Sequence, residues 1–212
     1  MIKKRADIPQ ELEVKFYLSD KAAFEERLRR IGAVLQRPRT LETNHRFDTA
    51  DMSLSRQHRV LRLRQDIDSI VTYKGPSILR DGVSSREEIE FKVSGFEAAR
   101  QFLEALGYKE SIRYEKWRTI YMLDEVEITL DEMPFGNFTE IEASEPRQIH
   151  LTATKLALDW KTRITSSYMV LFDQLRKTKK VNLANLTFEE FRNLPVTSQE
   201  LGVKPADKPL FI

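Results

Sequence analysis

The stretch ELEVKF, residues 11–16, alternates charged and apolar side chains in one continuous run. Alternation with a period of two predicts a β-strand that has one charged face and one apolar face. The charged face consists of Glu11, Glu13 and Lys15. Which face is enclosed decides the fold. Charges in water would belong to an ordinary sheet, whereas charges around an enclosed space are costly to bury and would indicate a binding site.

Seven further stretches have the same strand-like character, and short turn-like segments join several of them. They are residues 40–49, 59–66, 69–75, 86–93, 111–123, 126–133 and 138–143. Apolar residues at three- to four-residue spacing predict helices over residues 19–32, 95–107, 147–160 and 163–177. Residues 88–92 (EIEFK) echo residues 11–15 (ELEVK), and each half of this region reads as strand, helix and three strands. We therefore expect two related halves that close one structure.

The length and composition of the chain limit the class of protein. A chain of 212 residues suits one large domain with an extension, and we expect a domain over residues 1–178 and a tail over 179–212 that packs on it or trails from it. The net charge of only +2 argues against general nucleic-acid binding. The absence of cysteine excludes disulfides, thiolate metal sites and a cysteine nucleophile. No signal peptide or membrane-spanning run is recognisable, so we expect a cytoplasmic protein without a membrane partner.

Most of the predicted strands carry charged residues at alternate positions, two or four residues apart where a strand has more than one, which places each set on one face of its strand. The sets are Arg62 with Arg64, Lys74, Lys116 with Arg118, Glu88 with Glu90, Glu127 with Asp131, and Glu140 with Glu142. One interpretation is a sheet whose charged face is solvated. The other is an α+β fold built on a closed eight-stranded antiparallel β-barrel, a tunnel with a polar lumen, with helices packed outside and a helical C-terminal extension.

We favour the tunnel for three reasons. The pattern recurs on nearly every strand, and the apolar stripes of the helices need an apolar surface to cover. The signs are also sorted: Arg62, Arg64 and Lys74 lie in the first half, whereas Asp131, Glu140 and Glu142 lie in the second. A cationic cluster suits a polyanion with several phosphates, and a carboxylate cluster suits Mg²⁺ or Mn²⁺. The sequence therefore predicts a site for a metal-bridged polyphosphate, without a glycine-rich phosphate loop.

The motifs ELEVK, LRLR, TYKG, REEIE, EKWR, LDEMPFGNFTEIE and SY occur in this order between about residues 9 and 172. In this order they resemble the CYTH family, which belongs to the triphosphate tunnel metalloenzymes and includes thiamine triphosphatases, inorganic triphosphatases and class IV adenylate cyclases. The resemblance implies an eight-stranded antiparallel tunnel. It also implies a triphosphate held by cationic side chains, namely Lys15, Arg62, Arg64, Lys74, Lys116 and Arg118.

The resemblance further implies catalytic and metal-binding roles. Lys74 and Lys116 would lie close to the attacked phosphorus, and a lysine could serve as base where its neighbours favour the neutral form. The metal ligands would be Glu11, Glu13, Glu140, Glu142 and Asp131. Glu88 and Glu90 would support them.

A few residues depart from the family pattern or have two interpretations. His45 and Arg46 stand where relatives often have an aromatic pair. We expect His45 at the surface, with a role in substrate choice as the alternative. Arg86 and Arg113 could reach the lumen or could lie at the rim. Tyr168 is expected to pack in the core or at a lid over the tunnel.

The leading functional hypothesis is a divalent-metal-dependent hydrolase of a small-molecule triphosphate, with tripolyphosphate, thiamine triphosphate and nucleoside triphosphates as candidates. One alternative is a class IV-type adenylate cyclase, and another is a non-catalytic sensor of polyphosphate or nucleotide. The sequence shows no recognisable adenine pocket, which favours the hydrolase. It does not fix the oligomeric state, and a homodimer is one option.

Overall fold

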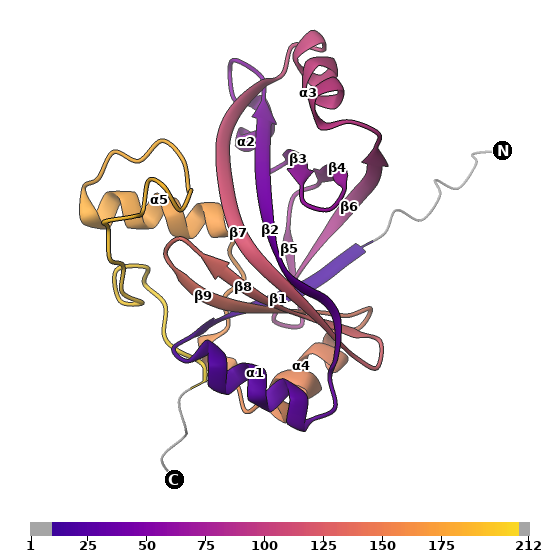
Figure 1. Ribbon diagram of the computed structural model, residues 1–212, viewed down its shortest axis with the longest axis vertical. Coiled ribbons are helices and arrows are strands. Elements are labelled where there is room, and N and C mark those ends of the chain that lie inside the picture. Colours follow the sequence, from indigo (N-terminus) through magenta and orange to yellow (C-terminus); the bar gives the residue numbers. More distant parts are fainter. Residues whose placement is uncertain (1–9, 208–212) are drawn as a thin grey trace, which may run out of the picture.

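The structure, a computed structural model, describes residues 10–207 as an antiparallel sheet surrounded by helices (Figure 1). The strands are β1 (Gln10–Leu18), β2 (Val34–Asp48), β3 (Val60–Gln65), β4 (Ser69–Lys74), β5 (Ile78–Arg80), β6 (Val83–Val93), β7 (Lys109–Leu123), β8 (Val126–Met133) and β9 (Gly136–Glu142). The helices are α1 (Lys21–Arg30), α2 (Ser53–Arg56), α3 (Phe96–Ala105), α4 (Pro146–Lys155), the 3₁₀ turn η1 (Trp160–Thr162) and α5 (Tyr168–Lys179). Over residues 10–207, none of these helices is both long and apolar enough to cross a bilayer.

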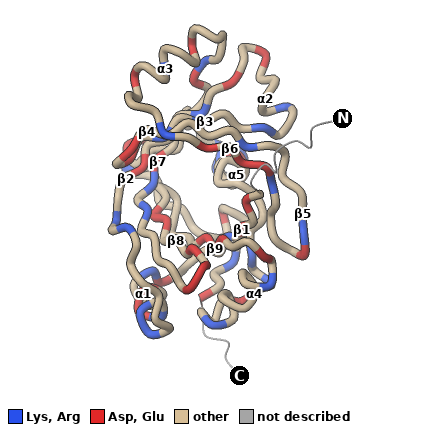
Figure 2. The backbone as a smooth tube through the Cα atoms, turned by 90° about the vertical axis from the view of Figure 1, so that its right-hand side faces the viewer, with Lys and Arg blue, Asp and Glu red and all other residues tan. Residues whose placement is uncertain are grey.

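Eight of the strands close into a ring, and among the described residues β5 pairs only with β6. The order around the ring is β1-β9-β8-β7-β2-β3-β4-β6, and a β1–β6 pairing closes it. In Figure 2 the strands surround an open centre. The first strand of each half pairs with the last strand of the opposite half, β1 with β9 and β6 with β4. The predicted ring of eight antiparallel strands is confirmed, and each half is built as strand, helix and three strands.

The apolar face of β1 points out of the ring and is covered by helices. Leu12, Val14 and Phe16 are fully or almost fully buried in one cluster with residues of α1 and α4, which lie side by side beneath the ring in Figure 1. Since burial of a large aliphatic or aromatic side chain stabilises a fold by about 1.5–3 kcal/mol, this outer layer supplies much of the core. The charged residues of β1 are left to face the centre.

Two further clusters cover the rest of the outer surface. Leu103 of α3 packs with Phe47, Leu63 and Val71 of β2, β3 and β4. Helix α5 packs through residues such as Phe172 against the other end of the ring. Helices therefore cover the outer face in three places, which is the arrangement that encloses the polar face of the sheet.

The segment after α5 folds back onto the ring. The backbone of Leu186 exchanges hydrogen bonds with Glu115 and Arg113, on the part of β7 that extends beyond its partner β8. Farther along, the Asp207 carboxylate accepts hydrogen bonds from the backbone of Ser19 and Asp20 just before α1, at 2.9 and 2.8 Å. These contacts satisfy backbone groups at a strand edge and at a helix start.

Some elements differ from the sequence prediction. Helix α5 begins at Tyr168, because the Ser167 side chain accepts a hydrogen bond from the Val170 amide and caps the helix. The residues before Tyr168 that were predicted as helical are not part of the helix, and Ile164 instead forms a β-bridge with Lys15 of β1. Strand β5 and the four-residue helix α2 have too few residues to give a periodic pattern, and the sequence did not predict them.

Candidate active site

The interior of the ring contains a cavity of about 560 Å³ to which all eight ring strands contribute charged side chains. Every predicted site residue except Asp131 lines this cavity. They are Glu11, Glu13, Lys15, Arg62, Arg64, Lys74, Glu88, Glu90, Lys116, Arg118, Glu140 and Glu142. The first motif of the sequence therefore points inward, and so do the matching motifs on the other strands.

Buried lysines on one side of the cavity are paired with carboxylates from the same strand or from other strands of the ring. Lys74 Nζ lies 2.7 and 2.8 Å from the two carboxylate oxygens of Glu11 and 2.9 Å from a carboxylate oxygen of Glu88. Burial, the largest contribution, raises the pKa of Glu11, but Lys74 and Arg86 outweigh it and hold the pKa below its usual range. On β1, Lys15 Nζ lies 2.6 Å from Glu13 Oε1.

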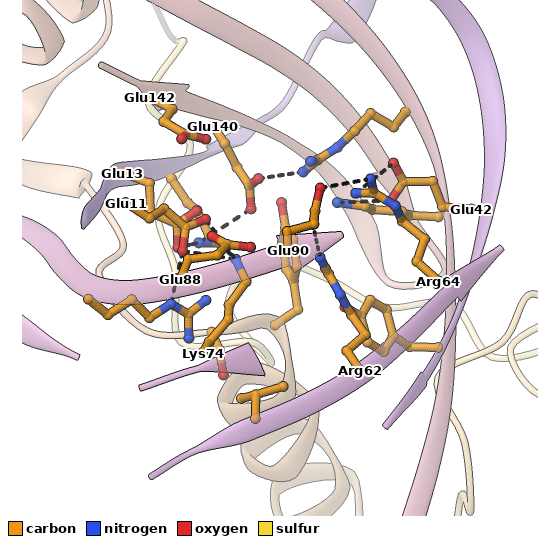
Figure 3. Close-up of a pocket in the computed structure, with 18 of the residues that line it drawn as sticks. Glu11, Glu13, Glu42, Arg62, Arg64, Lys74, Glu88, Glu90, Glu140 and Glu142 are labelled. Atoms are coloured by element: carbon orange, nitrogen blue, oxygen red, sulfur yellow. Dashed lines mark hydrogen bonds and ion pairs between the residues drawn. The ribbon is translucent and has the colours of Figure 1, made fainter. Parts of the chain in front are cut away.

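The arginines on the opposite side also have carboxylate partners. Arg64 lies 4.0 Å from Glu42 and 3.6 Å from Glu90, and the Lys116 ammonium lies 3.5 Å from Glu42. Glu42 is almost fully buried, and although burial raises its pKa, Lys116 and the neighbouring arginines lower it to about 2. Figure 3 shows the two groups facing each other, with Glu11, Glu13, Glu140 and Glu142 on one side and Arg62, Arg64 and Glu42 on the other. The predicted sorting of signs is thus only partial.

Asp131 has a different position from the one expected of a metal ligand. Its side chain is fully buried and does not line the cavity. Its oxygens accept hydrogen bonds from Lys116 at 3.1 Å, from Arg118 at 2.7 and 2.6 Å, and from the Tyr168 hydroxyl at 3.0 Å. Because both oxygens are engaged behind the cavity wall, this placement favours a positioning role over metal binding.

Three carboxylates on adjacent strands lie together with few cations near them. Glu142 of β9 is directly opposite Glu13 of β1 on one side and Glu127 of β8 on the other. Within residues 10–207, neither Glu127 nor Glu142 forms an ion pair. The Glu142 side chain lines the cavity and is in contact with solvent there. Desolvation by the surrounding protein, together with the Glu11, Glu127 and Glu13 carboxylates, raises its pKa to about 8. When deprotonated, Glu127 and Glu142 therefore place negative charge in this corner of the cavity that no ion pair compensates.

The donor set of this corner fits a hard divalent cation, because carboxylate oxygens are the preferred ligands of Mg²⁺ and Mn²⁺. A cation would remove the repulsion that raises the pKa of Glu142. In the conformation of residues 10–207 no three acidic, histidine or cysteine side chains already surround a single point. Glu11 and Glu13 are turned toward Lys74 and Lys15 instead.

Several lining residues were not predicted as site residues. They are Arg37, Glu42, Arg46, Tyr114, Glu127 and Tyr168. For β2 the sequence did contain a signal, because Glu42 and Arg46 alternate in one strand and share its inward face. Tyr168 had been expected to pack at the core or a lid; it is buried, and it also lines the cavity.

The structure shows where Arg86, Arg113 and His45 lie, each of which had two interpretations in the sequence. Arg86 lines the cavity and donates to Glu11 at 3.0 Å, whereas Arg113 does not line it and pairs with Glu110. His45 is not at the surface: it is buried on the outer side of the ring, where Nδ1 lies 2.7 Å from Glu110 and the ring packs edge-on against Phe96.

Comparisons with known proteins agree with this fold. A protein of Methanocaldococcus jannaschii named "Putative adenylate cyclase MJ0240" is 35% identical over 137 residues, which cover 63% of this chain and 77% of that protein. A solved structure from Vibrio parahaemolyticus, described as a putative adenylate cyclase, matches with a TM-score of 0.69 and 22% identity over 77% of this chain and 97% of the other. A Hippeastrum protein matches with a TM-score of 0.59 and 20% identity over 77% of this chain and 95% of the other, and its description states that an adenylyl cyclase candidate reveals a dominant triphosphatase activity.

The family model that matches is that of the CYTH domain, over residues 9–168. This range spans the whole ring and ends at the first residue of α5. The chain therefore belongs to the CYTH family.

Proposed function

We propose that this protein is a divalent-metal-dependent triphosphatase that releases phosphate from tripolyphosphate, thiamine triphosphate or a nucleoside triphosphate. The observation that carries the proposal is the combination of cationic side chains and an uncompensated carboxylate corner in one cavity. Cationic side chains can bind the oxygens of a triphosphate, and the carboxylate corner can bind the metal ion that accompanies it. The Hippeastrum neighbour, whose description names a dominant triphosphatase activity, supports the same choice.

In this proposal the cations hold the phosphates. Lys15, Arg62, Arg64, Lys74, Lys116 and Arg118 would bind phosphate oxygens. Arg62 and Arg64 are suited to bidentate contacts, because the guanidinium group matches two oxygens of one phosphate. Binding would replace the present carboxylate partners of these cations, such as Glu90.

The metal would be held by Glu11, Glu13, Glu140 and Glu142, with Glu88 and Glu90 in support. When bound, Mg²⁺ or Mn²⁺ neutralises phosphate charge and polarises the phosphoryl group. Asp131 would act from behind the wall, since it orients Lys116 and Arg118 toward the cavity.

Lys74 and Lys116 are the proposed catalytic residues. Both are buried cations on the cavity wall. In phosphoryl transfer to water, negative charge is spread over the oxygens around phosphorus, and fixed positive charges at those oxygens lower the barrier. Water attacks the terminal phosphorus, and the bond from this phosphorus to the bridging oxygen breaks with its electron pair on the diphosphate portion of the substrate, which is the leaving group. The attacked phosphorus becomes inorganic phosphate, and the proton lost by water passes to solvent or to the leaving oxygen.

An adenylate cyclase is the second candidate, because the Methanocaldococcus jannaschii relative carries that name. In that reaction the 3′-hydroxyl of ATP attacks the α-phosphorus and pyrophosphate leaves. The same cationic side chains would bind the triphosphate in both reactions.

A product analysis tests the proposal. The protein is incubated with Mg²⁺ or Mn²⁺ and with tripolyphosphate, thiamine triphosphate or ATP, and phosphate, pyrophosphate and cyclic AMP are measured. Phosphate release is the expected result. Cyclic AMP with pyrophosphate would replace the proposal by the cyclase, and absence of turnover would refute both enzymes.

A matched pair of variants links turnover to the cavity. Glu140→Gln should abolish metal-dependent phosphate release while the fold is retained. Glu125→Gln is the control, because Glu125 is exposed in the β7–β8 turn and should leave activity unchanged.

A further inference from the structure

Two arginines face each other across neighbouring strands inside the ring. Arg46 of β2 and Arg62 of β3 occupy directly opposite positions, and both side chains line the cavity. Like charges directly opposite each other destabilise a sheet. A pair of this kind is explained when an anion lies between the two guanidinium groups.

The two arginines differ in their present partners. Arg62 donates to Thr72 at 3.1 Å, to the Tyr114 hydroxyl at 3.4 Å and to Glu90 at 3.5 Å. The Arg46 guanidinium has no hydrogen bond or ion pair within residues 10–207. Burial lowers the pKa of Arg46, Tyr114 and Asp48 oppose this change, and Arg86 and Arg62 add to it. Arg46 is thus a largely enclosed cation that forms no ion pair with any of the described residues.

Asn44 provides a second, independent observation next to this pair. Its side chain is fully buried, and neither the amide nitrogen nor the amide oxygen has a hydrogen-bond partner within the part of the chain that the structure describes. It lies between Glu42 and Arg46 on the inward face of β2, directly opposite Tyr114 of β7. A buried amide without partners costs about 1–3 kcal/mol. Asn44 does not itself line the cavity, so the side chains that a ligand would contact here are those of Arg46, Arg62 and Tyr114.

The position of Arg46, Arg62 and Tyr114 in the cavity indicates which larger molecule the bound anion would belong to. Met169, from the first turn of α5, also lines the cavity and belongs to the same apolar cluster as Tyr114. Tyr114 therefore packs with α5, which lies on the far side of the ring in Figure 2. These three side chains are next to Arg64, a proposed phosphate ligand, which is directly opposite Asn44.

We propose that Arg46 and Tyr114, together with Arg62 of the proposed triphosphate site, form a further anion subsite, which takes the next phosphate of a linear polyphosphate longer than three units. The subsite rests on the proposed function, because it continues the same row of phosphates. A neutral nucleoside would leave the charge of Arg46 uncompensated, and the cationic thiamine group would be repelled by it. An additional phosphate supplies both the negative charge and the oxygen acceptors that this group lacks.

The experiment compares chain lengths without turnover. Isothermal titration calorimetry in EDTA measures binding of tripolyphosphate and of linear tetrapolyphosphate to the wild type and to Arg46→Gln. The wild type should bind tetrapolyphosphate about tenfold more tightly than tripolyphosphate, and Arg46→Gln should bring this ratio close to one, as expected for the loss of one charge-assisted contact. Tripolyphosphate affinity should change by less than about threefold.

Two further variants serve as matched controls. Arg46→Lys keeps the charge and should retain part of the preference. Arg39→Gln removes a positive charge from the same strand but on the outer face, where Arg39 stacks on Trp117 and pairs with Glu132, so the ratio should not change. Circular dichroism verifies that each variant is folded.

The outcomes separate the subsite from the function. If tripolyphosphate binds and is hydrolysed but Arg46→Gln leaves the ratio unchanged, the subsite is refuted and the triphosphatase stands. If Arg46→Gln weakens ATP but not tetrapolyphosphate, Arg46 serves a nucleoside and the subsite is again refuted. If neither polyphosphate binds in EDTA but tripolyphosphate is hydrolysed with Mg²⁺ or Mn²⁺, the subsite is refuted and the triphosphatase stands. If neither polyphosphate binds and tripolyphosphate is not hydrolysed with metal either, the proposed function fails and the subsite fails with it.

Discussion

The hydroxyl of Tyr168 donates a hydrogen bond of 3.0 Å to Asp131 Oδ2, which joins the first residue of α5 to the middle of β8. The same oxygen accepts from Lys116 and Arg118. The contact links the helix at one end of the ring to two cations of the proposed phosphate site. Burial and the nearby Asp131 and Glu140 carboxylates hold the pKa of Tyr168 well above its usual range, so the hydroxyl remains a donor at neutral pH.

Tyr168→Phe removes this donor and leaves the shape of the side chain unchanged. We expect a loss of about 1–3 kcal/mol in the free energy of unfolding, because Asp131 is buried and loses one partner. Turnover of tripolyphosphate should also fall, since Lys116 and Arg118 lose a fixed anchor. Urea denaturation and phosphate release measure the two effects.

The matched variant is Tyr121→Phe. The Tyr121 hydroxyl donates to Glu25 on the outer side of the ring, so its loss should leave turnover unchanged. Equal turnover in the wild type and Tyr168→Phe would contradict the positioning role of this contact.

Glu142→Gln tests the metal corner. The variant keeps an oxygen ligand but loses the charge, so we expect the metal concentration for half-maximal phosphate release to rise by at least about tenfold. Metal titration of the initial rate gives this value. Glu125→Gln should leave it unchanged, and an unaltered metal dependence in Glu142→Gln would remove this residue from the proposed ligand set.

The pKa of Glu142 also makes a prediction about pH. A carboxylate whose pKa is about 8 in the folded state and near 4.5 when unfolded binds its proton more tightly in the folded protein. It stabilises the metal-free protein most at pH values below about 4.5, and this stabilisation is lost as the pH rises to about 8. In EDTA, the wild type should therefore lose stability relative to Glu142→Gln as the pH increases from 5 to 8.

Chemical denaturation at a series of pH values measures this difference. Mg²⁺ should reverse the trend, because a metal ion binds the deprotonated carboxylate and its affinity rises with pH over the same range. A stability difference between wild type and Glu142→Gln that stays constant with pH would show that Glu142 has an ordinary pKa.

Leu186→Ala tests whether the segment after α5 is part of the folded domain. Leu186 is fully buried in the cluster that contains α5, so the cavity created should cost about 2–5 kcal/mol of unfolding free energy. Val170→Ala is the control, because Val170 is exposed on α5 and should cost less than about 0.5 kcal/mol. Thermal or urea unfolding measures both, and equal stabilities would mean that the segment contributes little.

The sequence predicts the ring and most of the cavity lining because a single rule applies to every strand. Alternation on one strand leaves the direction of its charged face open, but the recurrence on eight strands, together with apolar helices, indicates that the charged faces point inward. Glu11, Lys74 and Glu140 could be placed in this way. Glu42 and Arg46 follow the same rule on β2, and the sequence pattern alone is sufficient to place them on the inward face.

Other features depend on contacts that no local pattern contains. Asp131 looks in the sequence like its neighbours on the inward face, and it is distinguished only because Tyr168 covers it from α5. His45 is buried because α3 packs over it, as its contact with Phe96 shows. The segment after α5 has no periodicity, so its packing around Leu186 was not predictable.

The central claim is that the charged interior of the ring holds a triphosphate and its metal. A crystal structure of the protein grown with Mn²⁺ and tripolyphosphate, measured at a wavelength where manganese scatters anomalously, tests it most directly. The account predicts phosphate density in contact with Arg62, Arg64 and Lys116, and an anomalous peak next to Glu13 and Glu142. Phosphate and manganese found only on the outer surface, with the cavity free of both, would contradict it.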